Sequence, residues 1–261
     1  MRPAPVALLL AVLLASCGGE RAQTDDSARG EQAPGATTPP ASAPAAAPAG
    51  TPTGPETAKV PLDPKLVAAL GDSITAGSPL WDPDPSLRAQ ISARTGMEPD
   101  GRSQWEYWFE RADPRKRRVR NCGVFGERTD EIARRLERCA AGAATLVVQG
   151  GINDVAQGRS VAAAGRDLER MVQAGKAGGR RVALVEVLPW NNGYPDAAPK
   201  IDELNGAIRT IGRRRDVPVL RWYGALEDPA ARGLMRAEET IDGDHPSIAG
   251  YKRLAALVKL P

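Results

Sequence analysis

The sequence predicts an α/β fold in which a parallel sheet is covered by helices on both faces. Short apolar runs typical of buried strands alternate with longer segments whose apolar residues have helical spacing. After a first gap of 53 residues, the strand starts recur every 26 to 37 residues, which leaves room for a helix between successive strands. One such pattern fits in the 261 residues, so we expect one folded domain.

Each expected strand is a short apolar run that ends in a turn signal. The first run ends at Gly71, the third at Gly150 and the fourth at Pro189, and the fifth is shorter and interrupted by Pro218. The five expected strands are 65–70, 118–122, 144–149, 181–187 and 217–220.

The expected helices are read from capping signals and apolar spacing. Ser103 with Glu106 three residues later has the form of a capping box, which predicts a short helix at 103–111. Apolar residues recur at helical spacing in the other segments, as at Ile201, Leu204 and Ile208. These helices are expected at 129–139, 160–174, 198–213 and 247–259.

The first 63 residues have the composition of a targeting segment and a tether. The apolar run at 6–15 would span only about 15 Å as a helix, half of a bilayer, which is typical of a signal peptide. The sequence Leu-Ala-Ser-Cys that ends at Cys17 resembles the lipobox of bacterial lipoproteins, in which the cysteine is lipidated. From Ala33 to Ala58, 25 of 26 residues are Ala, Pro, Thr, Gly or Ser, which cannot build a core.

We therefore expect a signal peptide at 1–16, a lipidated Cys17 with a disordered tether at 17–63, and a folded domain at 64–261. The tether would reach roughly 37 Å as a flexible coil. The protein would be exported and held on a bacterial membrane by its lipid. The alternative is an ordinary cleaved signal peptide in which Cys17 occurs by chance.

Export would place Cys122 and Cys139 in an oxidising compartment, where a disulfide can form. If Cys122 ends a strand and Cys139 ends the helix that runs back, about 15 Å would separate them, beyond disulfide reach. We therefore expect these two cysteines to remain unpaired, with pairing as the alternative.

Charge and composition exclude several classes of function. The 198 residues from Pro64 to Pro261 carry a net charge of +5, interspersed along the sequence, which argues against nucleic-acid binding. The basic run 115–118 is expected to be a solvated strand entrance. With one His and three scattered Cys, no zinc site is expected, and no Gly-rich phosphate-binding motif suggests a nucleotide cofactor. We expect no cofactor, no metal and a monomer.

The single histidine, His245, lies in Asp-Gly-Asp-His-Pro after the last strand. Asp242 three residues earlier can hold one ring nitrogen, which leaves the other nitrogen free to act as a base. Ser73 follows the first strand in Gly-Asp-Ser-Ile-Thr, where a tight turn would expose its hydroxyl. These residues together predict a nucleophilic serine site.

Four ordered blocks of the sequence resemble the SGNH (GDSL-type) hydrolase superfamily. They are Gly-Asp-Ser-Ile-Thr at 71–75, Asn-Cys-Gly-Val-Phe-Gly at 121–126, Gly-Ile-Asn-Asp at 151–154 and Asp-Gly-Asp-His-Pro at 242–246. The resemblance covers essentially the whole domain. It implies a flavodoxin-like three-layer α/β/α fold with a five-stranded parallel sheet, and hydrolysis of esters or thioesters through an acyl-enzyme.

The resemblance also implies a role for each matching residue. Ser73 matches the nucleophile, His245 the general base and Asp242 the third member of the triad. The oxyanion donors would be the backbone N–H groups of Ser73 and Gly126 and the side-chain amide of Asn153. Each such donor stabilises the tetrahedral oxyanion by about 3 kcal/mol. Read without the resemblance, Gly126 is a turn glycine and Asn153 a helix cap.

Three residues are candidates for substrate binding. Trp81 and Trp190 lie in loops after the first and fourth strands, where they would form walls of the site or plug the core. Arg128 would bind an anionic group or form a structural salt bridge. Asp72 and Asp154 are expected to bond loop backbone, and the Asp244 side chain to point to solvent.

We therefore expect an exported, lipid-anchored serine esterase that acts on small-acyl esters, such as O-acetylated glycans. A lysophospholipase, thioesterase or acyltransferase would use the same residues. A catalytically idle, lipid-anchored binding protein is the alternative outside the enzyme class, although such a protein would have no physical need of the whole Ser-Asn-His set.

Overall fold

The structure is a computed structural model that describes residues 61–261. The expected signal peptide, Cys17 and nearly all of the tether lie outside these residues. The central sheet has five parallel strands, β1 (Asp63–Gly71), β2 (Arg118–Gly123), β3 (Ala143–Val148), β4 (Arg181–Val185) and β5 (Val219–Leu220). Their order across the sheet is β2-β1-β3-β4-β5. The predicted α/β class and five-stranded parallel sheet are confirmed.

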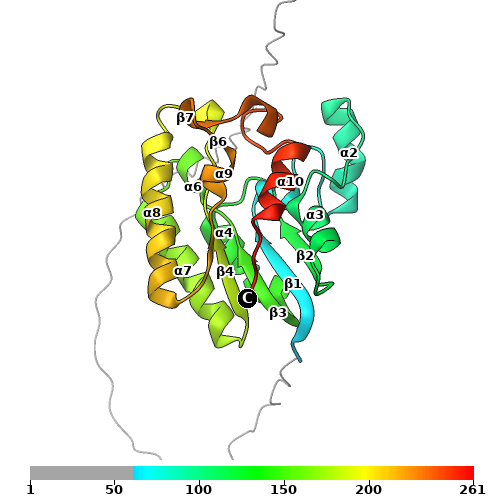
Figure 1. Ribbon diagram of the computed structural model, residues 1–261, viewed down its shortest axis with the longest axis vertical. Helices are drawn as coiled ribbons and strands as arrows, with labels where there is room; N and C mark the ends of the chain where they lie inside the picture. The colour runs from blue at the N-terminus through cyan, green and yellow to red at the C-terminus, as the bar shows by residue number, and fades with distance from the viewer. Residues whose placement is uncertain (1–60) are drawn as a thin grey trace, which may run out of the picture. The chain divides into compact units, whose positions relative to one another are not determined.

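Helices cover both faces of this sheet (Figure 1). One apolar core contains residues of α4 (Thr129–Arg134), α5 (Leu136–Ala140), α7 (Val161–Ala177) and α8 (Ala198–Arg215). The core on the opposite face contains residues of α3 (Trp105–Ala112), α9 (Trp222–Leu226) and α10 (Ile248–Ala256). Because side chains alternate along a strand, Val67 and Ala69 enter one core while Ala68 and Leu70 enter the other.

The strand order places the carboxyl ends of β2, β1 and β3 side by side. The chain moves from β1 outward to β2 and then returns to β3 on the other side of β1. Parallel sheets bind ligands at such a reversal, in the crevice beyond the carboxyl ends of the strands. The loops after β1, β2 and β3 carry three of the four sequence blocks, so the topology gathers them at one edge.

Several elements differ from the sequence prediction or are absent from it. The helix at Trp105 has Gln104 at its N-cap, one residue later than expected, so Ser103 and Glu106 do not have the spacing of a capping box, and Ser103 makes no capping bond. Helix α2 (Pro85–Thr95) and an antiparallel hairpin of β6 (Glu227–Asp228) and β7 (Ala231–Met235) were not predicted. Within residues 61–261, none of the helices is both long and apolar enough to cross a bilayer.

The expectation that Cys122 and Cys139 remain unpaired is wrong. Their Cα atoms lie 6.0 Å apart and the sulfur atoms form a disulfide. The predicted continuous helix at 129–139 breaks at Arg135, which separates α4 from α5. Cys139 therefore lies on a separate short helix beside the sheet, and not at the far end of a straight one.

Candidate active site

Ser73 begins a four-residue helix, α1 (Ser73–Ala76), directly after β1. Asp72 caps this helix, since its carboxylate accepts the N–H of Ile74 at 2.9 Å. The N–H of Ser73 is in the first turn, where backbone donors have no intrahelical acceptor. Gly71 allows the turn to be this tight, because a Cβ there would lie 2.1 Å from Thr75 Oγ1. The turn thus holds the Ser73 hydroxyl at the carboxyl edge of the sheet.

Gln149, at the end of β3, locks this turn to the neighbouring strand. Its Oε1 accepts from the Asp72 N–H at 3.2 Å and from Thr75 Oγ1 at 2.8 Å, and its Nε2 donates to Asp72 Oδ2 at 3.0 Å. Asp72 is fully buried, and this burial raises its pKa to about 6 despite the hydrogen bonds from Ile74 and Gln149. Asp72 therefore bonds loop backbone, as predicted.

His245 connects Ser73 to Asp242. Its Nε2 lies 3.1 Å from Ser73 Oγ, and its Nδ1 lies 2.7 Å from Asp242 Oδ2. Asp242 Oδ1 also accepts the backbone N–H groups of Asp244 and His245, at 2.9 and 2.7 Å. These bonds fix the carboxylate, and the carboxylate in turn fixes the orientation of the imidazole.

The environment of Asp242 keeps it ionised. Partial burial raises the pKa of its carboxyl, but the hydrogen bond from His245, the charge of His245 and the two backbone N–H groups together outweigh burial and lower the pKa. An ionised Asp242 favours the tautomer in which Nδ1 carries the proton, which leaves Nε2 free to accept the proton of Ser73.

Asn153 lies in the first turn of α6 (Ile152–Ala156) and lines the same cavity as Ser73 and His245. Its amide donates one N–H to the carbonyl oxygen of Glu127 at 3.0 Å. The amide has a second N–H, and Asn153 makes no capping bond in α6. The helix-cap interpretation is therefore not supported.

Gly126 lies in the loop after β2, with φ of +79°, a conformation that favours glycine. Its carbonyl accepts from Gln157 Nε2 at 3.0 Å. The next residue, Glu127, pairs with Arg135 at 2.6 Å, and Arg135 also donates to the carbonyl oxygens of Cys122 and Gly71, at 2.8 and 3.1 Å. The Arg135 guanidinium thus joins the loop that carries Gly126 to the ends of β2 and β1.

The cavity at Ser73 is small, with a volume of about 110 Å³. Apolar side chains form much of its wall, and polar groups from Ser73, Asn153 and His245 reach it; its apolar members are Ile74, Phe125, Ile152, Ala156 and Trp190. The sequence did not single out Phe125, whose ring is 64% exposed and lies 6.1 Å from the His245 ring. The sequence signal that could have identified Phe125 as a site residue is an aromatic side chain directly before the expected oxyanion glycine, Gly126.

Trp190 is held in the cavity wall by Asp244. Its Nε1 donates to Asp244 Oδ1 at 2.5 Å, and Asn192 Nδ2 donates to the same oxygen at 2.8 Å. The expectation that Asp244 points to solvent is therefore wrong, because the indole N–H needs an acceptor at the rim of the site. Asn191 next to Trp190 pairs with the backbone of Met235 in β7, so the hairpin supports this loop.

The other two candidate binding residues lie outside the residues that line this cavity. Trp81 packs against Gly101, and the guanidinium of Arg88 lies 4.6 Å from its ring centre. Arg128 bonds Asp130 at 3.1 Å and Gln157 at 2.9 Å and lies 3.5 Å from Glu131, which favours its structural interpretation. Asp154 accepts the N–H and hydroxyl of Thr129, so it too bonds loop backbone.

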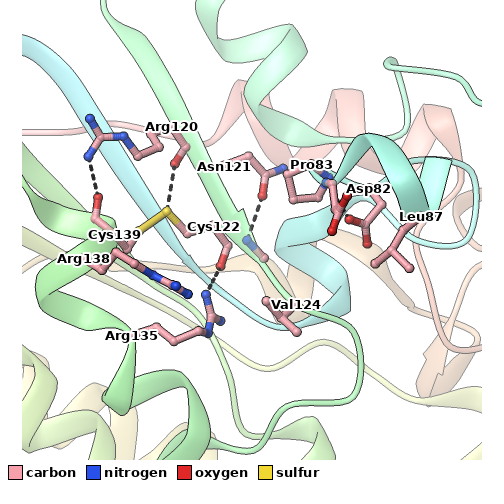
Figure 2. A pocket seen from close by; sticks show the side chains of 12 residues that line it. Asp82, Pro83, Leu87, Arg120, Asn121, Cys122, Val124, Arg135, Arg138 and Cys139 are labelled. Atoms are coloured by element: carbon pink, nitrogen blue, oxygen red, sulfur yellow. Dashed lines mark hydrogen bonds between the residues drawn. A yellow bond between two sulfur atoms is a disulfide. The ribbon is translucent and has the colours of Figure 1, made fainter.

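A larger cavity of about 400 Å³ lies beside the edge strand β2 (Figure 2). Its wall includes the disulfide, Arg120, Arg135, Arg138 and the loop at 82–84. Arg120 bonds the Cys139 carbonyl at 2.8 Å, next to the bond from Arg135 to Cys122. Neither Ser73 nor His245 lines this cavity, so it is separate from the serine site.

Within residues 61–261, the one group of three carboxylate, His or Cys ligands close enough to share a metal ion is Asp242, Asp244 and His245. Two of these residues are bonded to each other, and Asp244 is bonded to Trp190 and Asn192. The atoms that could bind a metal ion are therefore already engaged in hydrogen bonds within the serine site.

A hydroxyl, an imidazole and a carboxylate in this order, at the carboxyl edge of a parallel sheet, define the class of serine-dependent hydrolases. The model of the GDSL-like lipase/acylhydrolase family matches residues 69–253, and the chain belongs to this family. The protein is therefore a hydrolase of ester bonds.

Solved structures of the same fold include proteins of this family. A lipolytic protein of the G-D-S-L family from Desulfitobacterium hafniense superposes with a TM-score of 0.59 at 16% identity, covering 74% of this chain and 97% of that one. A GDSL-like lipase from Bacteroides thetaiotaomicron gives 0.57 at 23% identity, with 74% and 85% covered. A variant of an acetyl-xylooligosaccharide esterase from Geobacillus Stearmophilus gives 0.57 at 20% identity, with 76% and 94% covered. None of the curated proteins matches the sequence.

Proposed function

We propose that the protein is an esterase that cleaves small-acyl esters through an acyl-enzyme on Ser73. The observation that carries the proposal is the chain of contacts from Ser73 Oγ to His245 Nε2 and from His245 Nδ1 to Asp242, at the wall of an apolar cavity of about 110 Å³. His245 takes the proton of Ser73 as the serine oxygen attacks the ester carbonyl carbon. Asp242 stabilises the imidazolium that forms.

The tetrahedral intermediate carries a negative oxygen that needs donors. The Ser73 N–H, the Gly126 N–H and the second N–H of the Asn153 amide supply them in this proposal. Collapse of the intermediate breaks the bond to the alcohol, which leaves with the proton from His245. Water then attacks the acyl-enzyme, with His245 again as the base, and releases the acid and free Ser73.

The size of the cavity supports a short acyl group. A cavity of about 110 Å³ holds a few non-hydrogen atoms, which suits acetyl or propionyl. The alcohol would lie toward the exposed rim, where Phe125 offers a flat face on which a sugar can stack. An O-acetylated glycan is the substrate class that fits both ends, and the acetyl-xylooligosaccharide esterase among proteins of this fold is consistent with it.

A panel of p-nitrophenyl esters from acetate to laurate tests this proposal. We expect kcat/KM to be highest for acetate or propionate and to fall by about tenfold or more beyond butyrate, because longer chains do not fit the cavity. A maximum at eight or more carbons would favour the lysophospholipase or thioesterase alternative. Activity should survive EDTA. A fluorophosphonate should label the wild type but not Ser73→Ala, and labelling of that variant would place the nucleophile elsewhere.

We further propose that the protein is exported and anchored by a lipid on Cys17, as the lipobox suggests. The wild type should partition into detergent, and Cys17→Ser should abolish partitioning while ester hydrolysis is retained. A wild-type protein that stays in the aqueous phase after expression in its host would contradict the anchor and leave the esterase proposal intact.

A further inference from the structure

Positive charge is concentrated at one end of the folded domain. We define the basic pole as residues 61–65, 113–118, 137–142, 176–181 and 213–217, where strands begin and helices end. It contains twelve Lys or Arg and four Asp or Glu, a net charge of +8, whereas residues 61–261 as a whole carry +4. The rest of the domain is therefore net negative, which the interspersed charges of the linear sequence do not reveal.

The fold brings these residues together. In Figure 1, β1 begins and α7 and α8 end at the lower side of the domain, whereas the β6–β7 hairpin lies at the upper side. Contacts join the segments of the pole: Lys176 Nζ donates to the Arg215 carbonyl at 2.5 Å, Arg118 pairs with Asp63 at 3.0 Å, and Arg180 donates to the Ala140 carbonyl at 3.2 Å.

Most of this charge faces solvent. Lys65, Arg115, Lys176, Arg213 and Arg214 are all exposed. Basic residues at helix ends complement the helix dipole, which accounts for Lys176 and Arg213. The same explanation does not apply to Lys65, which lies in β1, or to Arg115, which lies in the turn before β2, so the pole has more positive charge than helix formation requires.

We propose that the basic pole docks on the surface of an anionic lipid bilayer. The proposal rests on the anchoring proposed above, because the chain that precedes Pro61 joins the domain at this pole. Each basic residue close to an anionic bilayer strengthens binding by about fivefold. The lipid on Cys17 brings the domain to the membrane, and the pole sets its orientation there.

Docking in this way turns the active site away from the membrane. Ser73 follows the carboxyl end of β1, and the eight residue steps from Asp63 to Gly71 span roughly 26 Å. The site would then open toward the space beyond the bilayer, where a glycan ester is accessible and the ester bonds of the bilayer's own lipids are not.

Vesicle sedimentation tests the proposal with residues 17–261 carrying Cys17→Ser, so that no lipid contributes. We expect binding to phosphatidylcholine vesicles that contain about 30 mol % phosphatidylglycerol, loss of binding in about 0.5 M NaCl, and no binding to neutral vesicles. A pole variant with four substitutions should bind at least about tenfold more weakly; these are Lys65→Gln, Arg115→Gln, Arg213→Gln and Arg214→Gln.

A control variant removes four exposed charges of the same sign from other parts of the domain and should bind within about twofold of the parent; these are Arg94→Gln, Lys200→Gln, Arg232→Gln and Lys252→Gln. Hydrolysis of soluble p-nitrophenyl acetate should be unchanged by anionic vesicles, because the site faces solvent. The proposal is wrong if the pole variant binds as strongly as the parent, or if the parent binds neutral vesicles equally well. It is also wrong if the parent binds soluble dextran sulfate but not vesicles, or if vesicles inhibit hydrolysis. If the parent protein does not hydrolyse p-nitrophenyl acetate even without vesicles, the esterase proposal is wrong, and the vesicle-binding results still decide the docking proposal.

Discussion

In the proposed mechanism, Asn153 both holds the site together and acts in it. One amide N–H bonds the Glu127 carbonyl, and the other would donate to the oxyanion. Asn153→Ala should therefore lower kcat by about a hundredfold to a thousandfold with little change in KM, since the oxyanion exists only after attack. Steady-state kinetics on p-nitrophenyl acetate measure this, and a loss confined to KM would contradict the oxyanion role.

In the proposed mechanism, Ser73 and His245 form one proton-transfer unit, so their contributions should not add. Ser73→Ala and His245→Ala should each abolish most of the rate, and the double variant should be scarcely slower than either. Measurement of kcat for the two single variants and the double variant on the same ester tests this prediction. A double variant whose loss equals the product of the single losses would show that the two residues act independently.

Trp190 is the cavity residue that we expect to set acyl preference. Trp190→Ala would enlarge the space beside Ser73, so longer acyl esters should gain relative to acetate by about tenfold in kcat/KM. Trp81→Ala is the matched control, because Trp81 does not line this cavity. An equal change in chain-length preference for both variants would mean that Trp190 acts only through general loosening of the loops.

At the scale of elements, the strands were predictable and the caps and bends were not. The central strands are continuous apolar runs, and their start and end were placed within about two residues. The four motifs of the site follow strands or precede a helix, so topology alone brought them together. The failures fall where tertiary contacts are made. Glu106 is buried in the core, and Arg135, at which the helix breaks, donates to the carbonyl oxygens of Gly71 and Cys122, which are distant in sequence.

The disulfide ties the end of β2 to α5 and should stabilise the domain. Joining residues 17 apart in sequence limits the unfolded chain and contributes about 3 kcal/mol. Cys122→Ser with Cys139→Ser should lower the free energy of unfolding by about this amount in urea denaturation. A reducing agent should destabilise the wild type and leave the double variant unaffected. Equal stability of the two proteins under oxidising conditions would contradict this.

Arg135 joins the Gly126 loop to the strands that precede the site. Arg135→Met would free the Gly71 and Cys122 carbonyls and leave Glu127 without its partner, so we expect kcat to fall by about tenfold to a hundredfold as the oxyanion donors lose their positions. The neighbouring Arg134→Met is the control, since that side chain is 72% exposed. A similar loss of activity in both variants would exclude a specific role for Arg135.

For the whole molecule, buried carboxyls give the stability a predictable dependence on pH. The charge-assisted hydrogen bonds from Arg117 lower the pKa of Asp113 to about 2, and Asp242 also has a lowered pKa. These groups contribute stability above the pKa values of the unfolded chain, and that stability is lost as the pH falls below about 4. Burial has the opposite effect on Asp72 and raises the pKa of this carboxyl to about 6.

The raised pKa values make the domain less stable as the pH rises. Between about pH 4 and pH 6 the unfolded chain releases a proton that folded Asp72 retains, so the free energy of unfolding should fall by up to about 3 kcal/mol. Glu106 adds to this decrease, because burial raises its pKa well above the ordinary value and, within residues 61–261, neither carboxylate oxygen has a hydrogen-bond partner. Stability should therefore be highest near pH 4 to 5.

Glu106→Gln tests this account, because the amide keeps the shape of the protonated acid but cannot ionise. At pH 8 the variant should unfold at a higher urea concentration than the wild type. At this pH the buried Glu106 of the wild type must either stay protonated or ionise inside the core, and both lower its free energy of unfolding. At pH 4, where both side chains are neutral, the two midpoints should coincide. Glu203→Gln, which removes an exposed carboxylate of α8, is the control for the loss of one negative charge. If Glu106→Gln destabilises the protein equally at pH 4 and pH 8, Glu106 affects stability through packing and not through its ionisation.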